Sequence, residues 1–400
     1  MRAVVYRGVN DLRLETVPVP RIGPHELLVR VAVCGVCPTD IKKIHYGTVP
    51  PPRIFGHETA GTIVRIGART SSLVPRHSSL RIGDRVALHH HVPCLDCHYC
   101  RHHAFAQCAT YKRTGITAGF EPAGGGYAEY VRVMPFVLPG VVKIPAKNSF
   151  AEGALLEPVN TVLKAVKRLD LLPGDRVLVA GQGPIGLMFT KLLQLAGMKV
   201  LATDLLPSRL RLARKFGAER AVLANQLTAK SSSFSAAGVE AVPSSLIPHP
   251  SSVRVPSLVT RHSSPLDAAV IAVPSDAAVA QALQLVRGAG KVLLFAHTKR
   301  AGVGDQKSEV GKKDSSPITH HPAPFTLDLA SICLDEKDLI GSYSSDFTLQ
   351  REVARLVFAR RLDVRSLITH RFPLAETAAA VALAARPTEA SLKIVVDVAG

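Results

Sequence analysis

Val177-Leu-Val-Ala-Gly181-Gln-Gly183-Pro-Ile-Gly186 is an apolar run that leads directly into a glycine-rich turn. The run predicts a strand at 176–180, and the apolar periodicity after the turn predicts a helix at 185–196. A glycine turn between a strand and a helix is the fingerprint of a dinucleotide-binding βαβ unit. Gly181 permits the tight turn, Gly183 lets the backbone approach a pyrophosphate, and Gly186 allows the helix to pack closely on the strand. The free N–H groups at the start of the helix then face the phosphates.

A carboxylate lies at the end of the next expected strand. In dinucleotide-binding folds this position contacts the adenosine ribose of the cofactor. The strand covers 199–203 and ends at Asp204, about 20 residues after Gly183. Asp204 would hold the ribose hydroxyls and repel a 2′-phosphate, so the sequence favours NAD over NADP. Arg209 keeps NADP open, because an arginine in this position can also contact a phosphate. A glycine turn in a doubly wound sheet without any cofactor is the alternative. The residues expected to contact the cofactor are Gly181, Gly183, Pro184, Ile185, Gly186, Asp204 and Arg209.

Four cysteines have the spacing of metal ligands, in the pattern Cys94-x2-Cys97-x2-Cys100-x7-Cys108. Four thiolates can surround one zinc ion tetrahedrally, and no coordination position then stays open for a substrate. The motif therefore predicts a structural zinc site, with buried free thiols or a redox pair as alternatives. The odd total of seven cysteines argues against a disulfide framework. The metal-type spacing, together with a charged N-terminus unlike a signal peptide, predicts a cytoplasmic location.

The composition is that of a globular protein and excludes several classes. The chain has 400 residues, of which 47% are hydrophobic and 20% charged, so two or three domains are expected. No run of about 20 uncharged apolar residues is present, so we expect no membrane partner. The formal net charge of +18 favours contact with anions such as nucleic acid or phosphate cofactors. Because the basic residues are scattered rather than gathered in a block, we expect no nucleic-acid partner.

The pattern along the chain predicts two kinds of sheet. Up to about residue 150, short β-rich runs alternate with glycine and proline, which predicts an antiparallel, barrel-like unit. From about residue 160, strands alternate with helical stretches, which predicts a parallel sheet. Residues 228–265 are rich in serine and proline and are expected to form an exposed, mobile insertion, with a packed βα unit as the alternative. A polar stretch at 298–324 is expected to be a loop.

Two further motifs, Gly35-Val-Cys37-Pro-Thr39-Asp40 and Gly56-His57-Glu58, are weak signals alone. Buried cysteines and single histidines are usually core residues. Together with the glycine turn and the four cysteines, however, they resemble the zinc-dependent medium-chain alcohol dehydrogenases. The resemblance covers most of the chain, and Leu156-Glu157-Pro158 is similar to the polyol and threonine dehydrogenase branch of that family.

The resemblance implies an α/β fold in which a GroES-like β-barrel catalytic domain is split around a doubly wound Rossmann domain. The implied catalytic domain covers 1–159 and 346–400 and carries the structural zinc lobe at about 90–112. The implied Rossmann domain covers 160–345. Relatives of this type are dimers or tetramers, so a homo-dimer or homo-tetramer is expected here.

The resemblance also implies catalytic residues. Cys37 and His57 match the first two ligands of a catalytic zinc, and Glu58 and Glu157 match carboxylates of that site. Zinc needs an open position for a substrate alcohol, and two bound carboxylates would make the site anionic. We therefore expect Glu58 and Glu157 to share the zinc or to exchange with water. Thr39 is implied to accept the proton of the substrate hydroxyl.

Three neighbouring residues complete these expectations. Asp40 is a candidate hydrogen-bond partner of a zinc ligand. His91, three residues before Cys94, is a candidate substrate contact, because threonine dehydrogenases carry a pocket histidine there. Lys42 stands where many relatives have histidine, which leaves the path of the proton to solvent open.

The expected function is the oxidation of a secondary alcohol, namely a polyol, a sugar-derived alcohol or an amino alcohol. Two zinc ions per chain and NAD are the expected cofactors, with the catalytic zinc as Lewis acid and NAD as hydride acceptor. The alternatives are a zinc-free, NADPH-dependent quinone-type reductase, a basic zinc-finger protein that binds nucleic acid, and a catalytically silent redox sensor. Bound zinc would exclude the zinc-free reductase. A salt-dependent affinity for DNA would support the zinc-finger protein.

Overall fold

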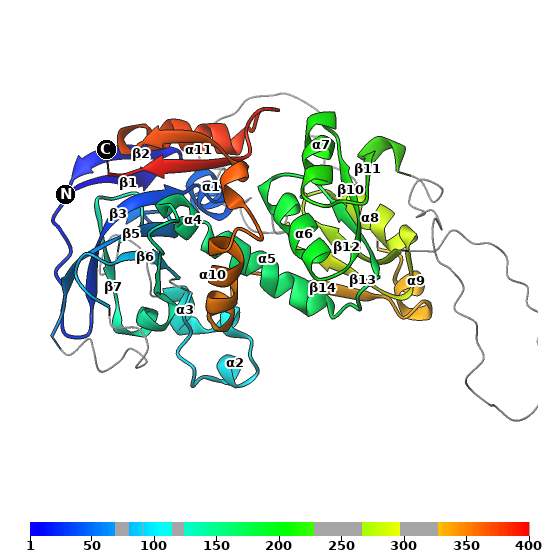
Figure 1. Cartoon of the computed structure of the whole chain (residues 1–400), viewed down its shortest axis with the longest axis horizontal. Helices are drawn as coiled ribbons and strands as arrows, with labels where there is room; N and C mark the ends of the chain where they lie inside the picture. Colours follow the sequence, from blue (N-terminus) through cyan, green and yellow to red (C-terminus); the bar gives the residue numbers. More distant parts are fainter. Residues whose placement is uncertain (69–79, 90, 114–123, 228–265, 297–326, 400) are drawn as a thin grey trace, which may run out of the picture.

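A computed structural model describes residues 1–68, 80–89, 91–113, 124–227, 266–296 and 327–399. The two segments expected to be irregular, 228–265 and 298–324, lie outside the described residues. Figure 1 shows two lobes of different architecture. The first and last parts of the chain form one lobe, which we call the catalytic lobe, and the middle of the chain forms the other, the cofactor lobe.

The cofactor lobe is built on a six-stranded parallel sheet with the order β11-β10-β9-β12-β13-β14. From β9 the chain first adds strands in one direction and then, from β12 on, in the other. This is the doubly wound order, in which a ligand binds at the carboxyl ends of the strands where the order reverses. The strands are β9 (Arg176–Ala180), β10 (Lys199–Asp204), β11 (Arg220–Leu223), β12 (Leu266–Ile271), β13 (Val286–Leu294) and β14 (Asp338–Gly341), and the helices are α6 (Pro184–Leu195), α7 (Pro207–Lys215), α8 (Asp276–Leu285) and α9 (Leu329–Leu334).

The catalytic lobe is mostly antiparallel. Its larger sheet has the order β15-β16-β3-β5-β6-β8, with β7 also paired to β3, and its smaller sheet has the order β2-β1-β4. The C-terminal strand β16 lies antiparallel to β3, so segments from the first and last parts of the chain share one sheet (Figure 1). The strands are β1 (Arg2–Gly8), β2 (Asp11–Thr16), β3 (Leu27–Gly35), β4 (Arg53–Ile54), β5 (Glu58–Ile66), β6 (Arg85–Leu88), β7 (Tyr130–Val133), β8 (Val142–Lys143), β15 (Ile368–Pro373) and β16 (Lys393–Asp397). A split GroES-like barrel around a Rossmann sheet confirms the expected fold class.

Helices of the catalytic lobe pack on its sheets and join it to the cofactor lobe. Helix α4 begins at a capping box, in which the Ser149 side chain accepts from the Glu152 backbone N–H and Glu152 accepts in return. The helices are α1 (Pro38–Tyr46), α2 (His98–Arg101), α3 (Ala109–Arg113), α4 (Phe150–Ala154), α5 (Leu156–Leu169), α10 (Gln350–Phe358) and α11 (Thr377–Ala385).

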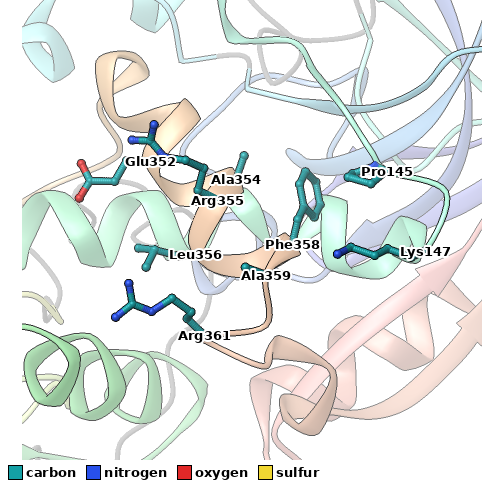
Figure 2. Close-up of a pocket in the computed structure, with 9 residues that line it drawn as sticks. All are labelled: Pro145, Lys147, Glu352, Ala354, Arg355, Leu356, Phe358, Ala359 and Arg361. Atoms are coloured by element: carbon teal, nitrogen blue, oxygen red, sulfur yellow. The ribbon is translucent and has the colours of Figure 1, made fainter.

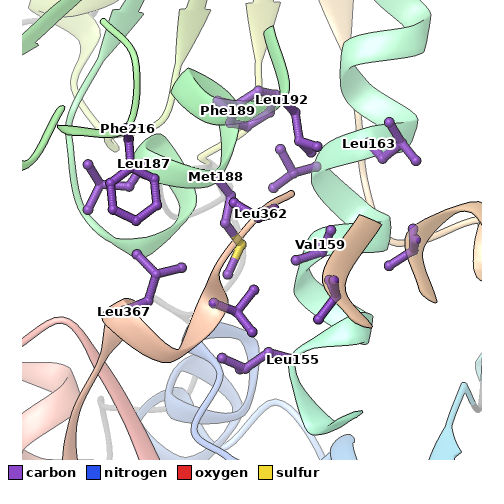
Figure 3. Close-up of a cluster of buried hydrophobic side chains, with 14 of the residues drawn as sticks. Leu155, Val159, Leu163, Leu187, Met188, Phe189, Leu192, Phe216, Leu362 and Leu367 are labelled. Atoms are coloured by element: carbon purple, nitrogen blue, oxygen red, sulfur yellow. The ribbon is translucent and has the colours of Figure 1, made fainter. Parts of the chain in front are cut away.

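Helix α5 is the main connection between the lobes. Its apolar residues recur at helical spacing, so one face buries Leu156, Val159 and Leu163. This face packs against α6 of the cofactor lobe and against α10. Figure 3 shows the resulting cluster, to which the segment after α10 also contributes. The labelled members of the cluster are Leu155, Val159, Leu163, Leu187, Met188, Phe189, Leu192, Phe216, Leu362 and Leu367. A single core therefore spans both lobes and fixes the position of one against the other.

A surface groove lies along α10, beside the start of α4 (Figure 2). Its volume is about 750 Å³, and it contains none of the residues expected at the zinc or cofactor sites. The groove is lined by Pro145, Lys147, Glu352, Ala354, Arg355, Leu356, Phe358, Ala359 and Arg361. Among the described residues, no helix has the length and apolar character needed to cross a membrane.

We predict that Leu187→Ala lowers the free energy of unfolding by about 2–5 kcal/mol. Leu187 is fully buried in the cluster that joins the lobes, so the change leaves a cavity there. Leu172→Ala is the matched control, because Leu172 is 72% exposed and should change stability by less than about 0.5 kcal/mol. Urea unfolding followed by circular dichroism measures both. Equal losses for the two variants would contradict this description of the core.

Candidate active site

Three side chains of the kinds that bind metal ions meet in the catalytic lobe. The ligand atoms of Cys37, His57 and Glu58 all lie within 4.8 Å of one another. Cys37 lies two residues after the end of β3 as the N-cap residue of α1, and Glu58 opens β5, which pairs with β3. Gly35 faces Glu58, and a Cβ at position 35 would lie 1.9 Å from the Glu58 Oε2. The glycine therefore leaves room for the glutamate. One thiolate, one imidazole and one carboxylate form a donor set that suits zinc.

A buried carboxylate orients the histidine of this cluster. Asp40 Oδ2 lies 3.0 Å from His57 Nδ1, and both side chains are almost fully buried. Burial alone would raise the pKa of Asp40, but the facing His57 lowers it below its usual value. Because Nδ1 faces Asp40, the other ring nitrogen of His57 is turned to the metal side. Asp40 thus has the orienting position that the sequence predicts.

The sequence analysis missed the partner of Glu58, which is Lys393 at the start of β16. The Lys393 Nζ lies 2.6 Å from the Glu58 carboxylate and also donates to the Val36 carbonyl at 2.8 Å. Lys393 is 5% exposed. Burial alone would lower the pKa of Lys393, but the Glu58 carboxylate raises it above its usual value. A lysine in the otherwise apolar run Lys393-Ile-Val-Val is the one sequence signal that could have revealed this pair.

Glu157 lies outside the three-residue cluster and contacts a histidine. Its Oε1 lies 3.2 Å from His91 Nδ1, and both side chains are largely buried. His91 Nδ1 also lies 3.0 Å from the Ser345 Oγ, and the ring of His91 contacts that of Tyr111. The rings of His57 and His91 are 6.0 Å apart, so Glu157 and His91 adjoin the metal-binding side chains. Tyr111 and Ser345 are residues that the sequence analysis did not single out.

Thr39 is half-buried on the first turn of α1, between the cluster residue Cys37 and Asp40. Lys42 follows on the same helix, and burial lowers its pKa below the usual value. Cys34, near the end of β3, is fully buried, and burial raises its pKa to about 12. Cys34 is therefore a protonated thiol of the core.

The four cysteines of the lobe at 90–112 form a second cluster. Zinc–sulfur bonds of about 2.3 Å at tetrahedral angles place the sulfur atoms about 3.8 Å apart. The Sγ–Sγ separations are 3.5 Å for Cys97–Cys100, 3.6 Å for Cys94–Cys108 and 3.9 Å for Cys94–Cys100. Backbone N–H groups of Asp96 and Cys97 lower the pKa of Cys94 to about 6, which favours the thiolate that zinc needs. The geometry fits a closed, four-thiolate zinc site.

The glycine turn between β9 and α6 has the geometry of a phosphate cradle. Gly181 has φ +91°, and a Cβ at position 186 would lie 1.7 Å from the Gly181 carbonyl oxygen. No other residue type fits either position without movement of the backbone. A Cβ at Gly183 would meet no atom within 4 Å, so space for a ligand remains in front of the turn. Pro184 and Ile185 open α6, whose first N–H groups face this space.

Asp204 ends β10 beside this turn and ties it in place. Its carboxylate accepts from the Gln182 backbone N–H at 2.7 Å and from the Leu206 N–H at 3.0 Å. Arg209 differs from the sequence expectation, because it is 6% exposed and donates to the backbone carbonyls of Ser391 and Thr388. In this structure the Arg209 guanidinium joins α7 to the catalytic lobe rather than standing free to meet a cofactor phosphate.

Two family models match the chain. The alcohol dehydrogenase GroES-like domain matches residues 23–146, and the zinc-binding dehydrogenase domain matches residues 184–358. The chain is 28% identical to the sorbitol dehydrogenase of Bombyx mori, over 99% of this chain and 98% of that protein. It is 32% identical to the sorbitol dehydrogenase of Bacillus subtilis, over 54% of this chain and 60% of that protein.

A solved structure with the same fold agrees with these matches. The alcohol dehydrogenase TADH from Thermus sp. ATN1 is 26% identical, with a TM-score of 0.74 and 99% of each chain covered. The first family model falls in the catalytic lobe, and the second covers most of the cofactor lobe. The chain belongs to the zinc-dependent medium-chain alcohol dehydrogenases.

Proposed function

We propose that this chain oxidises a secondary hydroxyl group of a polyol, with NAD as hydride acceptor. The observation that carries the proposal is the meeting of three potential metal ligands, the half-buried Cys37 and the buried His57 and Glu58. Three protein ligands leave zinc one open position, which a substrate hydroxyl can take. Sorbitol dehydrogenases among the similar proteins support a polyol as substrate.

The charges of the site support this chemistry. A thiolate at Cys37 and a carboxylate at Glu58 would balance the charge of one zinc ion, while Lys393 compensates part of the carboxylate charge. Zinc, when bound, supplies a Lewis acid that lowers the pKa of a substrate hydroxyl. Cys37 and His57 are the ligands we propose to be constant. Glu58 reaches the metal only in competition with Lys393, and Glu157 lies outside the three-residue set, in contact with His91.

Other residues of the chain bind and orient the reactants. Asp40 fixes the ring of His57. Thr39 takes up the proton of the substrate hydroxyl and at the same time releases its own hydroxyl proton to water. Glu157 and His91 offer hydrogen bonds to the neighbouring hydroxyls of a polyol. Gly181, Gly183, Pro184, Ile185 and Gly186 hold the pyrophosphate, and Asp204 holds the adenosine ribose.

The remaining parts of the proposal concern the whole molecule. Cys94, Cys97, Cys100 and Cys108 hold a second, structural zinc ion. The catalytic domain covers 1–159 and 346–400, and the Rossmann domain covers 160–345. The protein acts in the cytoplasm as a homo-dimer or homo-tetramer. A zinc-free quinone-type reductase has no use for the two metal-binding clusters, which disfavours that alternative.

We predict about two zinc ions per chain in protein purified without chelator. Cys37→Ser removes a ligand of the catalytic zinc, so this variant should contain about one zinc ion and should lose its activity while remaining folded. Cys333→Ser is the matched control, because Cys333 is exposed on α9 and lies outside both clusters. Metal analysis and an NADH absorbance assay with sorbitol measure the outcome. Full turnover by Cys37→Ser would refute the catalytic assignment.

We predict that the protein prefers NAD and that Asp204→Asn weakens this preference about tenfold or more. A hydrogen bond to a charged group contributes about 1.5–3 kcal/mol, which corresponds to that factor. Asparagine keeps one acceptor oxygen for the Gln182 N–H of the glycine turn, while the hydrogen bond from the Leu206 N–H is lost together with the charge. The ratio of kcat/KM with NAD to that with NADP measures the effect. A clear preference of the unchanged protein for NADP would show that Asp204 does not select the cofactor.

A further inference from the structure

We propose that Tyr111, a residue of the four-cysteine lobe, is a positioning residue for the substrate side of the active site. It holds His91 against Glu157, so the structural zinc cluster supports the polyol pocket and does more than stabilise its own loop. This inference rests on the proposed function for the role of Glu157 and His91. The contacts themselves belong to the described structure.

Tyr111 is tied to the cysteine cluster at its backbone. It lies on α3, three residues after the zinc-ligand candidate Cys108, and its N–H donates to the Cys108 sulfur. Its side chain is 7% exposed and packs with Cys100 and Cys108 in one small core. A change at the zinc cluster therefore moves the backbone that carries this ring.

The ring of Tyr111 meets the active site through His91. The two rings are in contact in a tilted arrangement, with their centres 4.7 Å apart and their planes at 37°. His91 Nδ1 lies 3.2 Å from the Glu157 Oε1 and 3.0 Å from the Ser345 Oγ. One face of the imidazole is thus covered by Tyr111, while its edge is held by a carboxylate and a hydroxyl. Without the Tyr111 ring, His91 keeps its contacts with Glu157 and Ser345 but loses the side chain that packs against its ring.

The hydroxyl of Tyr111 makes a second connection. It is hydrogen-bonded to the Ser344 Oγ in a buried position. Ser344 belongs to the segment that leads from β14 of the cofactor lobe back to α10. The same segment is contacted by Phe105 of the cysteine lobe, whose ring lies edge-on to Phe347 at 5.5 Å. The lobe is therefore fixed at two points to the chain that passes between the cofactor lobe and the catalytic lobe.

These contacts make a specific demand on the side chain at position 111. The ring is needed to place His91, whereas the hydroxyl anchors the crossing segment. Phenylalanine keeps the ring and loses the hydroxyl, and leucine loses both. The substrate-side effect should therefore be large for Tyr111→Leu and small for Tyr111→Phe.

The kinetic test compares Tyr111→Leu, Tyr111→Phe and the control Tyr99→Leu, with sorbitol and NAD as probes. Tyr99 lies in the same lobe but is 50% exposed, with its ring against His98. For Tyr111→Leu we expect about a tenfold fall in kcat/KM for sorbitol, an unchanged KM for NAD and two zinc ions per chain. Tyr111→Phe should stay within about threefold of the unchanged protein, and Tyr99→Leu should match it.

Three results would overturn the proposal. The first is a kcat/KM for sorbitol of Tyr111→Leu within twofold of the unchanged protein. The second is a loss that appears equally in the KM for NAD. The third is a loss of the structural zinc that accounts for the fall in activity, because Tyr111 would then only stabilise its lobe.

A crystal structure of Tyr111→Leu gives a test that needs no activity. The proposal requires His91 to leave hydrogen-bond distance of Glu157 in this variant and to keep it in Tyr111→Phe. An unmoved His91 in Tyr111→Leu would refute the positioning role. If the unchanged protein oxidises no polyol, the proposed function has failed, and the position of His91 in these variants still decides the role of Tyr111.

Discussion

A buried ion pair between Lys393 and Glu58 holds the catalytic lobe closed around its metal-binding side chains. The two residues are 335 positions apart, and both are almost fully buried. A buried charge is tolerated only when it is paired, so neither residue can keep its place without the other. Since Lys393 opens β16 and Glu58 opens β5, the pair joins the last of these strands to the strand that His57 directly precedes. The separate segments of the catalytic lobe thus meet at the site they serve.

The rest of the architecture brings the cofactor turn to this site. Helix α5 begins in the catalytic lobe with Glu157 near its first turn and then packs against α6, which follows the glycine turn. The same helix therefore carries a carboxylate of the active site and the core that fixes the cofactor lobe. The guanidinium of Arg209 adds a second tie between the lobes through the carbonyls of Ser391 and Thr388. These contacts fix the orientation of the two lobes. A cofactor on one lobe and a substrate on the other can therefore be held next to each other.

Local patterns were enough to predict the parts of the fold that depend on neighbouring residues. The strand expected at 176–180 is β9. The turn after it requires glycine at 181 for the positive φ of that residue and at 186 for the close approach to the Gly181 carbonyl, and both requirements are local in the sequence. The four cysteines likewise lie close together in the chain. By contrast, helices α4 and α5 were not expected before residue 160, because their apolar face fits both a buried helix and short strands. The distant contact of Tyr111 with His91 leaves no local pattern, and that of Lys393 with Glu58 leaves only a lysine in an apolar strand, which does not name its partner. Arg209 illustrates the same limit, since its partners lie about 180 residues away.

A double-mutant cycle on the Lys393–Glu58 pair is the most direct test of this account. Lys393→Met leaves the Glu58 carboxylate buried and unpaired, which should cost about 3–5 kcal/mol of unfolding free energy. Glu58→Gln in the same chain removes the unpaired charge, so the double variant should recover most of that loss. Urea unfolding of metal-free protein measures the four members of the cycle without a contribution from bound zinc. If the losses of unfolding free energy in the two single variants add, so that the double variant is less stable than Lys393→Met, the central role of this ion pair is contradicted.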